Sequence, residues 1–170
     1  MDLRSLISDH ADFPKKGILF HDFAPILKDP QALSYVIDEF SNLYDMNNVD
    51  VIVGIESRGF ILGTAMAVRH QKGFTMIRKA GKTPGRTIKT SYELEYGSST
   101  IEMRCDALDK GQRVLLCDDL LATGGTMKAA ADLVNSMGSI ISGMAFIIEL
   151  TDLNGRNTIG DYNIHSLVKY

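Results

Sequence analysis

Apolar runs that predict buried strands recur along the chain, and most of them are followed by small or charged residues. Three of them are Val51–Ile55, Phe74–Ile77 and Val114–Cys117. Short continuous apolar runs are typical of strands that are covered on both faces, as in parallel sheets. Two further runs, Ile140–Leu150 and Ile164–Val168, predict strands near the carboxyl end of the chain.

Apolar residues at helical spacing lie between these runs. They predict helices after Asp29 and Pro30, over Phe60–Arg69, and over Met127–Met137, where a glycine follows as a stop signal. The segment Asp2–His10 predicts a further short amphipathic helix. A strand, a helix and a second strand in this order form a right-handed unit whose two strands are parallel. The pattern therefore predicts an α/β fold.

Two segments with period-two alternation, Ser91–Gly97 and Thr100–Cys105, predict an exposed β-hairpin. Gly81 and Gly85 lie shortly before it. A hairpin flanked in this way has the freedom to move as a lid, although a charged sheet edge would have the same pattern.

The stretch Val114–Thr126 carries the strongest chemical signal. We expect its apolar strand to end before Asp118 and Asp119, and a turn of small residues then opens a helix. A helix N-terminus attracts anions, and adjacent glycines let the main chain close around a phosphate. The two carboxylates suit the diol of a ribose or a hydrated cation, so the combination predicts a site for a ribose 5-phosphate. The turn consists of Ala122, Thr123, Gly124, Gly125 and Thr126, and we expect its threonines to donate to the phosphate and to cap the helix.

Charged residues also follow the two earlier strands. Glu56, Ser57 and Arg58 come directly after Val51–Ile55, at the sheet edge where ligands of parallel sheets bind, and arginine can hold phosphate oxygens with two bonds. The strand Phe74–Ile77 is followed by the basic residues Arg78, Lys79, Lys82 and Arg86. They indicate either a solvated loop or a second anion site. A P-loop is excluded because Met76 stands where its first glycine would be.

Composition narrows the class of protein. The 170 residues, 45% of them hydrophobic, suit a single domain with a substantial core. A net charge of −3 without a basic cluster argues against a nucleic-acid surface. The two cysteines form neither a disulfide framework nor a zinc pattern. The start lacks the profile of a signal peptide, and Val51–Val68 is interrupted by charges and predicts no membrane span. We therefore expect a cytoplasmic protein that binds neither nucleic acid nor a membrane.

The stretch Cys117–Thr126 resembles the phosphoribosyl pyrophosphate-binding motif of type I phosphoribosyltransferases, in the version of the adenine-specific members. Hypoxanthine–guanine members usually carry an acid where this chain has Ala122. The resemblance extends over nearly the whole chain, through five segments. It implies a single domain over 1–170, with a central, mostly parallel sheet flanked by helices. It also implies an N-terminal purine-binding hood (1–30) and a flexible catalytic lid hairpin (80–105).

The resemblance further implies a reaction: transfer of the 5-phosphoribosyl group from phosphoribosyl pyrophosphate to adenine, which gives AMP and pyrophosphate. Mg²⁺ is the implied cofactor, held by the substrate and through water by Asp118 and Asp119 rather than by direct protein ligands. A homodimer is the implied assembly.

Site residues carried over by the resemblance fall into four groups. Those for ribose 5-phosphate are Asp118, Asp119, Ala122, Thr123, Gly124, Gly125 and Thr126. Those for pyrophosphate are Glu56, Ser57, Arg58, Arg78, Lys79 and Lys82. Those for adenine are Leu19, Phe20, His21 and Leu150. Those on the catalytic lid are Glu95, which meets the purine, and Tyr96.

Two departures from the family pattern concern the purine side: Lys16 replaces a usual proline, and His21 replaces a usual arginine. Three alternatives therefore stay open. The chain could act on another base, although Ala122 argues against 6-oxopurines. It could be a non-catalytic regulator that senses phosphoribosyl pyrophosphate. It could bind a dinucleotide, although no G-x-G-x-x-G follows any predicted strand.

Overall fold

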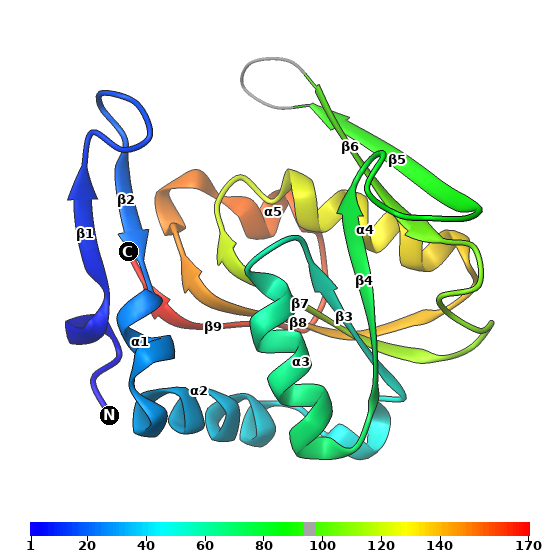
Figure 1. The fold of residues 1–170 in the computed structure, drawn as a ribbon, viewed down its shortest axis with the longest axis horizontal. Helices are drawn as coiled ribbons and strands as arrows, with labels where there is room; N and C mark the ends of the chain where they lie inside the picture. The colour runs from blue at the N-terminus through cyan, green and yellow to red at the C-terminus, as the bar shows by residue number, and fades with distance from the viewer. Residues whose placement is uncertain (94–97) are drawn as a thin grey trace.

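The computed structural model describes residues 1–93 and 98–170, which form both strands and helices (Figure 1). In chain order they are η1 (Arg4–Leu6), β1 (Ser8–Ala11), β2 (Leu19–Asp22), α1 (Ala24–Lys28), α2 (Pro30–Leu43), η2 (Met46–Asn48), β3 (Val51–Ile55), α3 (Gly59–His70), β4 (Gly73–Lys79), β5 (Thr87–Glu93), β6 (Ser98–Arg104), β7 (Arg113–Leu121), α4 (Gly125–Ser136), β8 (Ile140–Glu149), η3 (Thr151–Leu153), α5 (Gly155–Ile159) and β9 (Ile164–Lys169). The α/β prediction is confirmed.

The main sheet has seven strands in the order β5-β6-β4-β3-β7-β8-β9. Strands β4, β3, β7, β8 and β9 are parallel, and β5 and β6 join as an antiparallel hairpin. After β3 the chain crosses to one side of that strand, and β7 lies on its other side. The direction of winding therefore reverses between β3 and β7, and such a reversal places ligands beyond the carboxyl ends of the two strands.

Helices cover both faces of this sheet (Figure 1). Ile52 of β3 and Leu115 of β7 belong to a buried cluster with α2 and α3. Val53 and Leu116, their chain neighbours, belong to a second cluster with α4. This alternation follows from the period of two in a strand, and it explains why the runs are apolar throughout.

Helix α2 begins as predicted. Asp29 is its N-cap, and the Asp29 carboxylate accepts from the backbone N–H groups of Gln31 and Ala32 at 2.8 and 3.2 Å. The helix buries Val36 and Phe40 against the sheet.

The expected helix over Asp2–His10 is wrong. Residues 4–6 form a short 3-10 turn, and β1 follows and pairs antiparallel with β2, from Ser8 opposite Asp22 to Ala11 opposite Leu19. The N-terminal segment gains these hydrogen bonds from a partner distant in sequence, and a local pattern does not report such a partner. Helix α1 was also not predicted.

Several strand boundaries differ from the predictions. Strand β4 continues past Ile77 to Lys79, and β6 begins at Ser98 rather than Thr100. Strand β5 begins at Thr87, four residues before the predicted start, because its ladder with β6 already starts there. Strand β7 does not stop before the acids. Its pairing with β3 ends at Cys117, but β8 continues beside it as far as Leu121, so both acids lie inside the strand. Within residues 1–93 and 98–170, no helix is long and apolar enough to cross a membrane.

Candidate active site

The turn after β7 is built from main chain. Gly124 is the N-cap of α4, at φ 85°, and no side chain caps this helix, so the expected capping by threonine is wrong. A Cβ added at Gly124 would lie 2.4 Å from the carbonyl oxygen of Gly155. The turn borders a hollow of about 70 Å³ that is lined by residues 120–127, Asp118 and Phe146. The free N–H groups of a helix start therefore border a small cavity, as an anion site requires.

The two acids of β7 have different surroundings. Asp119 forms an ion pair with Arg58, whose Nη2 lies 2.6 Å from the Asp119 Oδ2. Burial, and then the neighbouring charge of Asp119, raises the pKa of the Asp118 carboxyl well above its ordinary value. Arg58 comes from the turn after β3, so this ion pair joins the two turns at the reversal of the sheet.

Close packing brings these turns together. Gly59, the first residue of α3, lies against β7, and a Cβ added there would be 2.5 Å from the Cys117 carbonyl oxygen. A side chain at this position would push the turn after β3 away from the acids. The Glu56–Ser57 peptide bond in this turn is cis, and the Ser57 residue is exposed.

Glu56 connects the turn after β3 with the basic residues at the end of β4 and in the loop that follows it. Its carboxylate accepts from the Lys82 ammonium at 2.8 Å and from the Lys79 backbone N–H at 2.9 Å, and Arg78 Nη2 lies 3.6 Å away. Burial alone would raise the pKa of Glu56, but these hydrogen bonds and positive charges outweigh burial and lower it. Three of the predicted pyrophosphate residues, Arg78, Lys79 and Lys82, thus meet around the carboxylate of a fourth, Glu56.

Arg78 has donor capacity left. Its Nη1 donates to the Lys82 carbonyl oxygen at 2.6 Å, and its buried Nε has no hydrogen-bond partner within the described ranges. A buried guanidinium N–H without a partner is costly in free energy, which favours an anion near this loop.

The N-terminal segment reaches the same place. The Arg58 guanidinium carbon lies 5.0 Å from the centre of the Phe20 ring and 5.4 Å from that of Phe23, within the range of a cation–π contact. The Leu150 N–H donates to the Leu121 carbonyl at 2.9 Å, so Leu150 lies beside the end of β7. Leu19 is exposed. Two segments from opposite ends of the chain, both predicted to bind the purine, therefore flank the two turns.

His21 has partners of its own. Its Nδ1 lies 2.6 Å from the Asp9 carboxylate, and its ring stacks on Tyr170 with 3.7 Å between the ring centres. The His21 side chain is 6% exposed. The histidine that replaces the usual arginine therefore ties the N-terminal hairpin to the end of the chain, which lies beside β2 (Figure 1).

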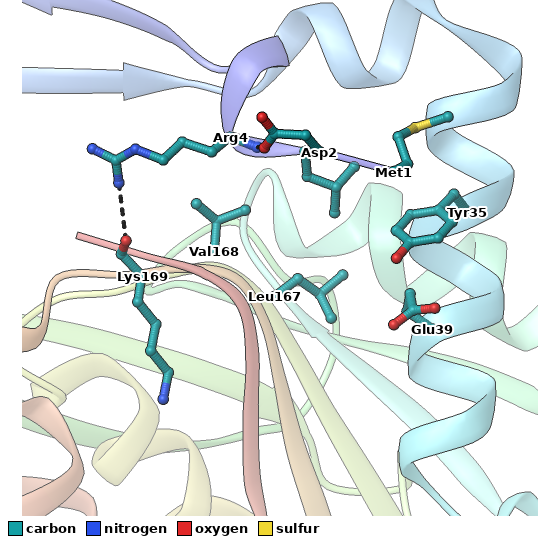
Figure 2. A pocket seen from close by; sticks show the side chains of 9 residues that line it. Met1, Asp2, Arg4, Tyr35, Glu39, Leu167, Val168 and Lys169 are labelled. Carbon is teal, nitrogen blue, oxygen red and sulfur yellow. Dashed lines mark hydrogen bonds between the residues drawn. The ribbon is translucent and has the colours of Figure 1, made fainter.

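Another hollow, of about 270 Å³, lies between the first four residues, α2 and β9 (Figure 2). Arg4 crosses its edge and donates to the Lys169 carbonyl at 2.9 Å. Its guanidinium carbon also lies 3.7 Å from the centre of the Tyr170 ring. This hollow shares no residue with the predicted site, and its contacts fasten the N-terminal hairpin to the last strand.

Two lid residues predicted as catalytic, Glu95 and Tyr96, lie outside the described residues. The hairpin base is described, and there Thr126 Oγ1 donates to the Tyr92 hydroxyl at 3.0 Å. In the part of the chain that the structure describes, no three Asp, Glu, His or Cys side chains form a metal-binding cluster.

Sequence reasoning missed several residues of this neighbourhood, namely Phe23, Tyr92, Glu102 and Gly155. Glu102 is buried between the buried residues Ile101 and Met103 of β6, and an acid inside such a run was the available signal. Phe23 and Gly155 carried no local signal, because their contacts are made with segments far away in sequence.

Residues 25–160 match the model of the phosphoribosyl transferase domain. The chain is 59% identical over 170 residues to the adenine phosphoribosyltransferase of Nitrosopumilus maritimus, and the match covers 100% of both chains. The adenine phosphoribosyltransferase structure from Thermoanaerobacter pseudethanolicus matches with a TM-score of 0.96 at 44% identity, over 99% of this chain and 98% of that one. The Saccharomyces cerevisiae enzyme, solved with adenine and an imino-altritol bisphosphate, matches with a TM-score of 0.92 at 37% identity, over 98% and 96%.

Proposed function

The chain belongs to the adenine phosphoribosyltransferase family, and from this premise we propose how its residues transfer the 5-phosphoribosyl group to adenine. The reaction forms a bond between adenine N9 and the ribose C1, breaks the bond from C1 to pyrophosphate, and releases the N9 proton. The observation that carries the assignment is the ion pair between Arg58 and Asp119, at 2.6 Å, because it joins the proposed pyrophosphate turn to the proposed ribose turn.

The ribose 5-phosphate binds, in this proposal, at the end of β7. The N–H groups of the turn from Ala122 to Thr126 surround the 5-phosphate, because they open α4 and no side chain caps them. The carboxylates of Asp118 and Asp119 accept from the ribose hydroxyls.

Pyrophosphate binds, in the same proposal, between the turn after β3 and the end of β4 with the loop that follows it. The residues that receive it are Glu56, Ser57, Arg58, Arg78, Lys79 and Lys82. Their charges stabilise the leaving group as negative charge develops on it. The free Nε of Arg78 is one donor that suits a phosphate oxygen.

Adenine lies, in this proposal, between the N-terminal hairpin and the chain after β8. Leu19, Phe20 and Leu150 contact the ring, and His21 contributes its main chain because its side chain is held by Asp9 and Tyr170. Glu95 of the lid accepts the purine proton or fixes its tautomer, with Tyr96 beside it. Glu95→Gln should lower kcat more than it raises KM, and the reverse result would make Glu95 a binding residue.

The mechanism needs positioning and the exclusion of water rather than a nucleophile. The ribose C1 becomes cationic as the bond to pyrophosphate breaks, and water would hydrolyse such a centre. Mg²⁺ neutralises negative charge on a diphosphate when it is bound. The donor set fits this cofactor, since magnesium typically uses one or two carboxylates together with substrate phosphates, and β7 offers two. Asp118 and Asp119 would hold it through water.

We also propose a homodimer in the cytoplasm. Support for the dimer comes from α3 and β4, which expose Ile61, Val68 and Met76, with Val68 at 75% exposed. Ile61 and Val68 lie seven residues apart and therefore share one face of α3, and exposed apolar side chains that gather in one patch are typical of an interface. The molar mass in solution, measured by light scattering, tests this assembly.

A pyrophosphate-release assay tests the function. It contains the protein, phosphoribosyl pyrophosphate and Mg²⁺, with adenine, hypoxanthine, guanine or no base. Turnover with adenine alone is the expected result. Turnover with another base would overturn the proposed purine contacts but keep the sugar site. Binding of the sugar without turnover would indicate a regulator.

A further inference from the structure

Glu102 is a buried acid beside the loop between β4 and β5, which carries Lys82 of the proposed pyrophosphate site. It lies on β6, and its side chain is 2% exposed. It is paired with Arg78 of β4 on one side and with Lys89 of β5 on the other. A carboxylate so deep in a sheet requires several donors to remain charged.

The donors are the main chain of the loop and the side chains of β5. Glu102 Oε1 accepts from the backbone N–H groups of Lys82 and Thr83, at 3.0 and 2.9 Å. Glu102 Oε2 lies 3.4 Å from the Lys89 ammonium and 3.4 Å from the Thr87 hydroxyl. Burial alone would raise the pKa of Glu102, but these donors outweigh burial and lower it, so the group is ionised near neutral pH.

The loop between β4 and β5 has two further main-chain bonds: the Ala80 N–H donates to the Thr100 carbonyl at 2.9 Å, and the Lys82 N–H also reaches the Lys79 carbonyl at 3.3 Å. Gly81 and Gly85 both have positive φ, at 88° and 85°. Glu102 holds the N–H of Lys82, while Arg78 Nη1 donates to the carbonyl of the same residue at 2.6 Å. The Lys82 main chain is thus held from both sides, and its ammonium reaches Glu56 at 2.8 Å.

We propose that Glu102 is a positioning residue for pyrophosphate, which acts by holding the main chain of Lys82 so that the ammonium meets the leaving group. This inference rests on the proposed function. Glu102 touches no substrate in this proposal, because its negative charge lies behind the loop and is balanced by Lys89. Lys82 carries the contact with the anion.

The first test is steady-state kinetics of Glu102→Ala and Glu102→Gln in the full chain. We expect Glu102→Ala to raise KM for phosphoribosyl pyrophosphate about tenfold or more and to leave KM for adenine within about twofold, because the N–H groups of Lys82 and Thr83 lose their charged side-chain acceptor. Glu102→Gln should lie between Glu102→Ala and the wild type, since the amide oxygen still accepts. Binding of inorganic pyrophosphate, measured by calorimetry, should weaken in parallel.

A matched control is Asp50→Asn. Asp50 also accepts from a backbone N–H and from a side-chain cation, both of Arg113, but it lies at the opposite end of the strands. The substitution Asp50→Asn should lower the free energy of unfolding and leave KM for phosphoribosyl pyrophosphate and KM for adenine unchanged. An equal rise of KM for phosphoribosyl pyrophosphate in Asp50→Asn would indicate a general loss of folding and overturn the proposal.

A double-mutant cycle separates positioning from an independent effect. If Glu102 acts through Lys82, the variant Glu102→Ala/Lys82→Ala should have the same KM for phosphoribosyl pyrophosphate as Lys82→Ala alone. Additive losses would overturn the proposal.

If the wild type lacks turnover with adenine, the proposed function fails, and weaker pyrophosphate binding by Glu102→Ala would still support positioning. If the wild type turns over and Glu102→Ala binds pyrophosphate normally, the positioning role alone fails.

Discussion

The turn after β3 and the turn after β7 end at the same edge of the sheet, but they face the site with different parts of the chain. The first presents charged side chains, with Glu56 bonded to Lys82 at 2.8 Å. The second presents main chain, with Gly124 at φ 85° as the residue that opens α4. A side-chain site depends on charge and tolerates small changes of shape. A main-chain site depends on shape, because an added Cβ occupies the space of the ligand or of a neighbouring strand.

The largest expected effect comes from a substitution that disrupts the main-chain turn. Gly124→Ala combines a positive φ with a Cβ that would lie 2.4 Å from the Gly155 carbonyl oxygen. We expect a loss of about 2–5 kcal/mol in the free energy of unfolding, the sum of left-handed strain and overpacking. Binding of phosphoribosyl pyrophosphate should fall below detection. Denaturant unfolding and calorimetry measure the two effects.

Gly111→Ala is the control for strain alone. Gly111 has nearly the same φ, 83°, and nothing lies within 4 Å of an added Cβ. It should lose about 1–2 kcal/mol of stability, the cost of the left-handed backbone, and keep its substrate affinity. Equal losses in both glycine variants would contradict the claim that packing against Gly155 shapes the turn.

The next effect concerns the charged turn. Arg58→Ala should raise KM for phosphoribosyl pyrophosphate about 10–100-fold, because a charged hydrogen-bond donor is lost. Arg58→Lys should recover part of the affinity, since lysine keeps the charge but not the two-pronged geometry. Steady-state kinetics with saturating adenine measures both.

Arg69→Ala is the matched control, because Arg69 also pairs with an aspartate, Asp38, at 3.0 Å, but at the far end of α3. It should leave the kinetics unchanged. An unaltered KM in Arg58→Ala would exclude Arg58 from the pyrophosphate site.

A smaller effect is expected from the side-chain hydrogen bond between Thr126 of the main-chain turn and Tyr92 of the hairpin. Tyr92→Phe removes the acceptor of the Thr126 hydroxyl, which lies at 3.0 Å. One neutral hydrogen bond contributes about 0.5–1.5 kcal/mol, so KM for phosphoribosyl pyrophosphate should rise about two- to tenfold. Thr126→Ser keeps the hydroxyl and should behave as the wild type. The opposite order of the two variants would show that the Thr126 methyl group matters rather than the bond to Tyr92.

The two turns also differ in how far the sequence predicted them. The order of strands, acids, glycines and helix could be predicted from neighbouring residues alone. Strands and helices follow from the spacing of apolar side chains, and turns follow from their glycines and small polar residues. The role of Gly124 as the cap could not be predicted in this way, since it depends on Gly155, thirty-one residues later in the chain. The network around Glu102 was missed for the same reason: alternation alone does not say that a buried acid meets the loop N–H groups of another segment. The mistaken N-terminal helix has the same cause, a strand partner that lies beyond a local pattern.

The smallest expected effect is a pH dependence of stability, which should be present for the charged turn and absent for the main-chain turn. The pKa of Glu56 is lowered below its ordinary value of 4.5, because the hydrogen bonds from Lys82 and the Lys79 backbone, with the charges of Lys82 and Arg78, outweigh burial. Its contribution to stability is therefore fully present above pH 4.5 and is lost as the pH falls through the lowered pKa. Glu56→Gln should cost ~1 kcal/mol at neutral pH, as expected for a pair with a half-exposed lysine, and almost nothing in strong acid.

Gly124→Ala has no titrating group, so its loss of stability should be the same at both pH values. Thermal unfolding of the two variants and the wild type, above and well below pH 4.5, measures this contrast. A pH-independent loss in Glu56→Gln would mean that Glu56 supports its turn by shape rather than by charge, and the distinction between the two turns would then fail.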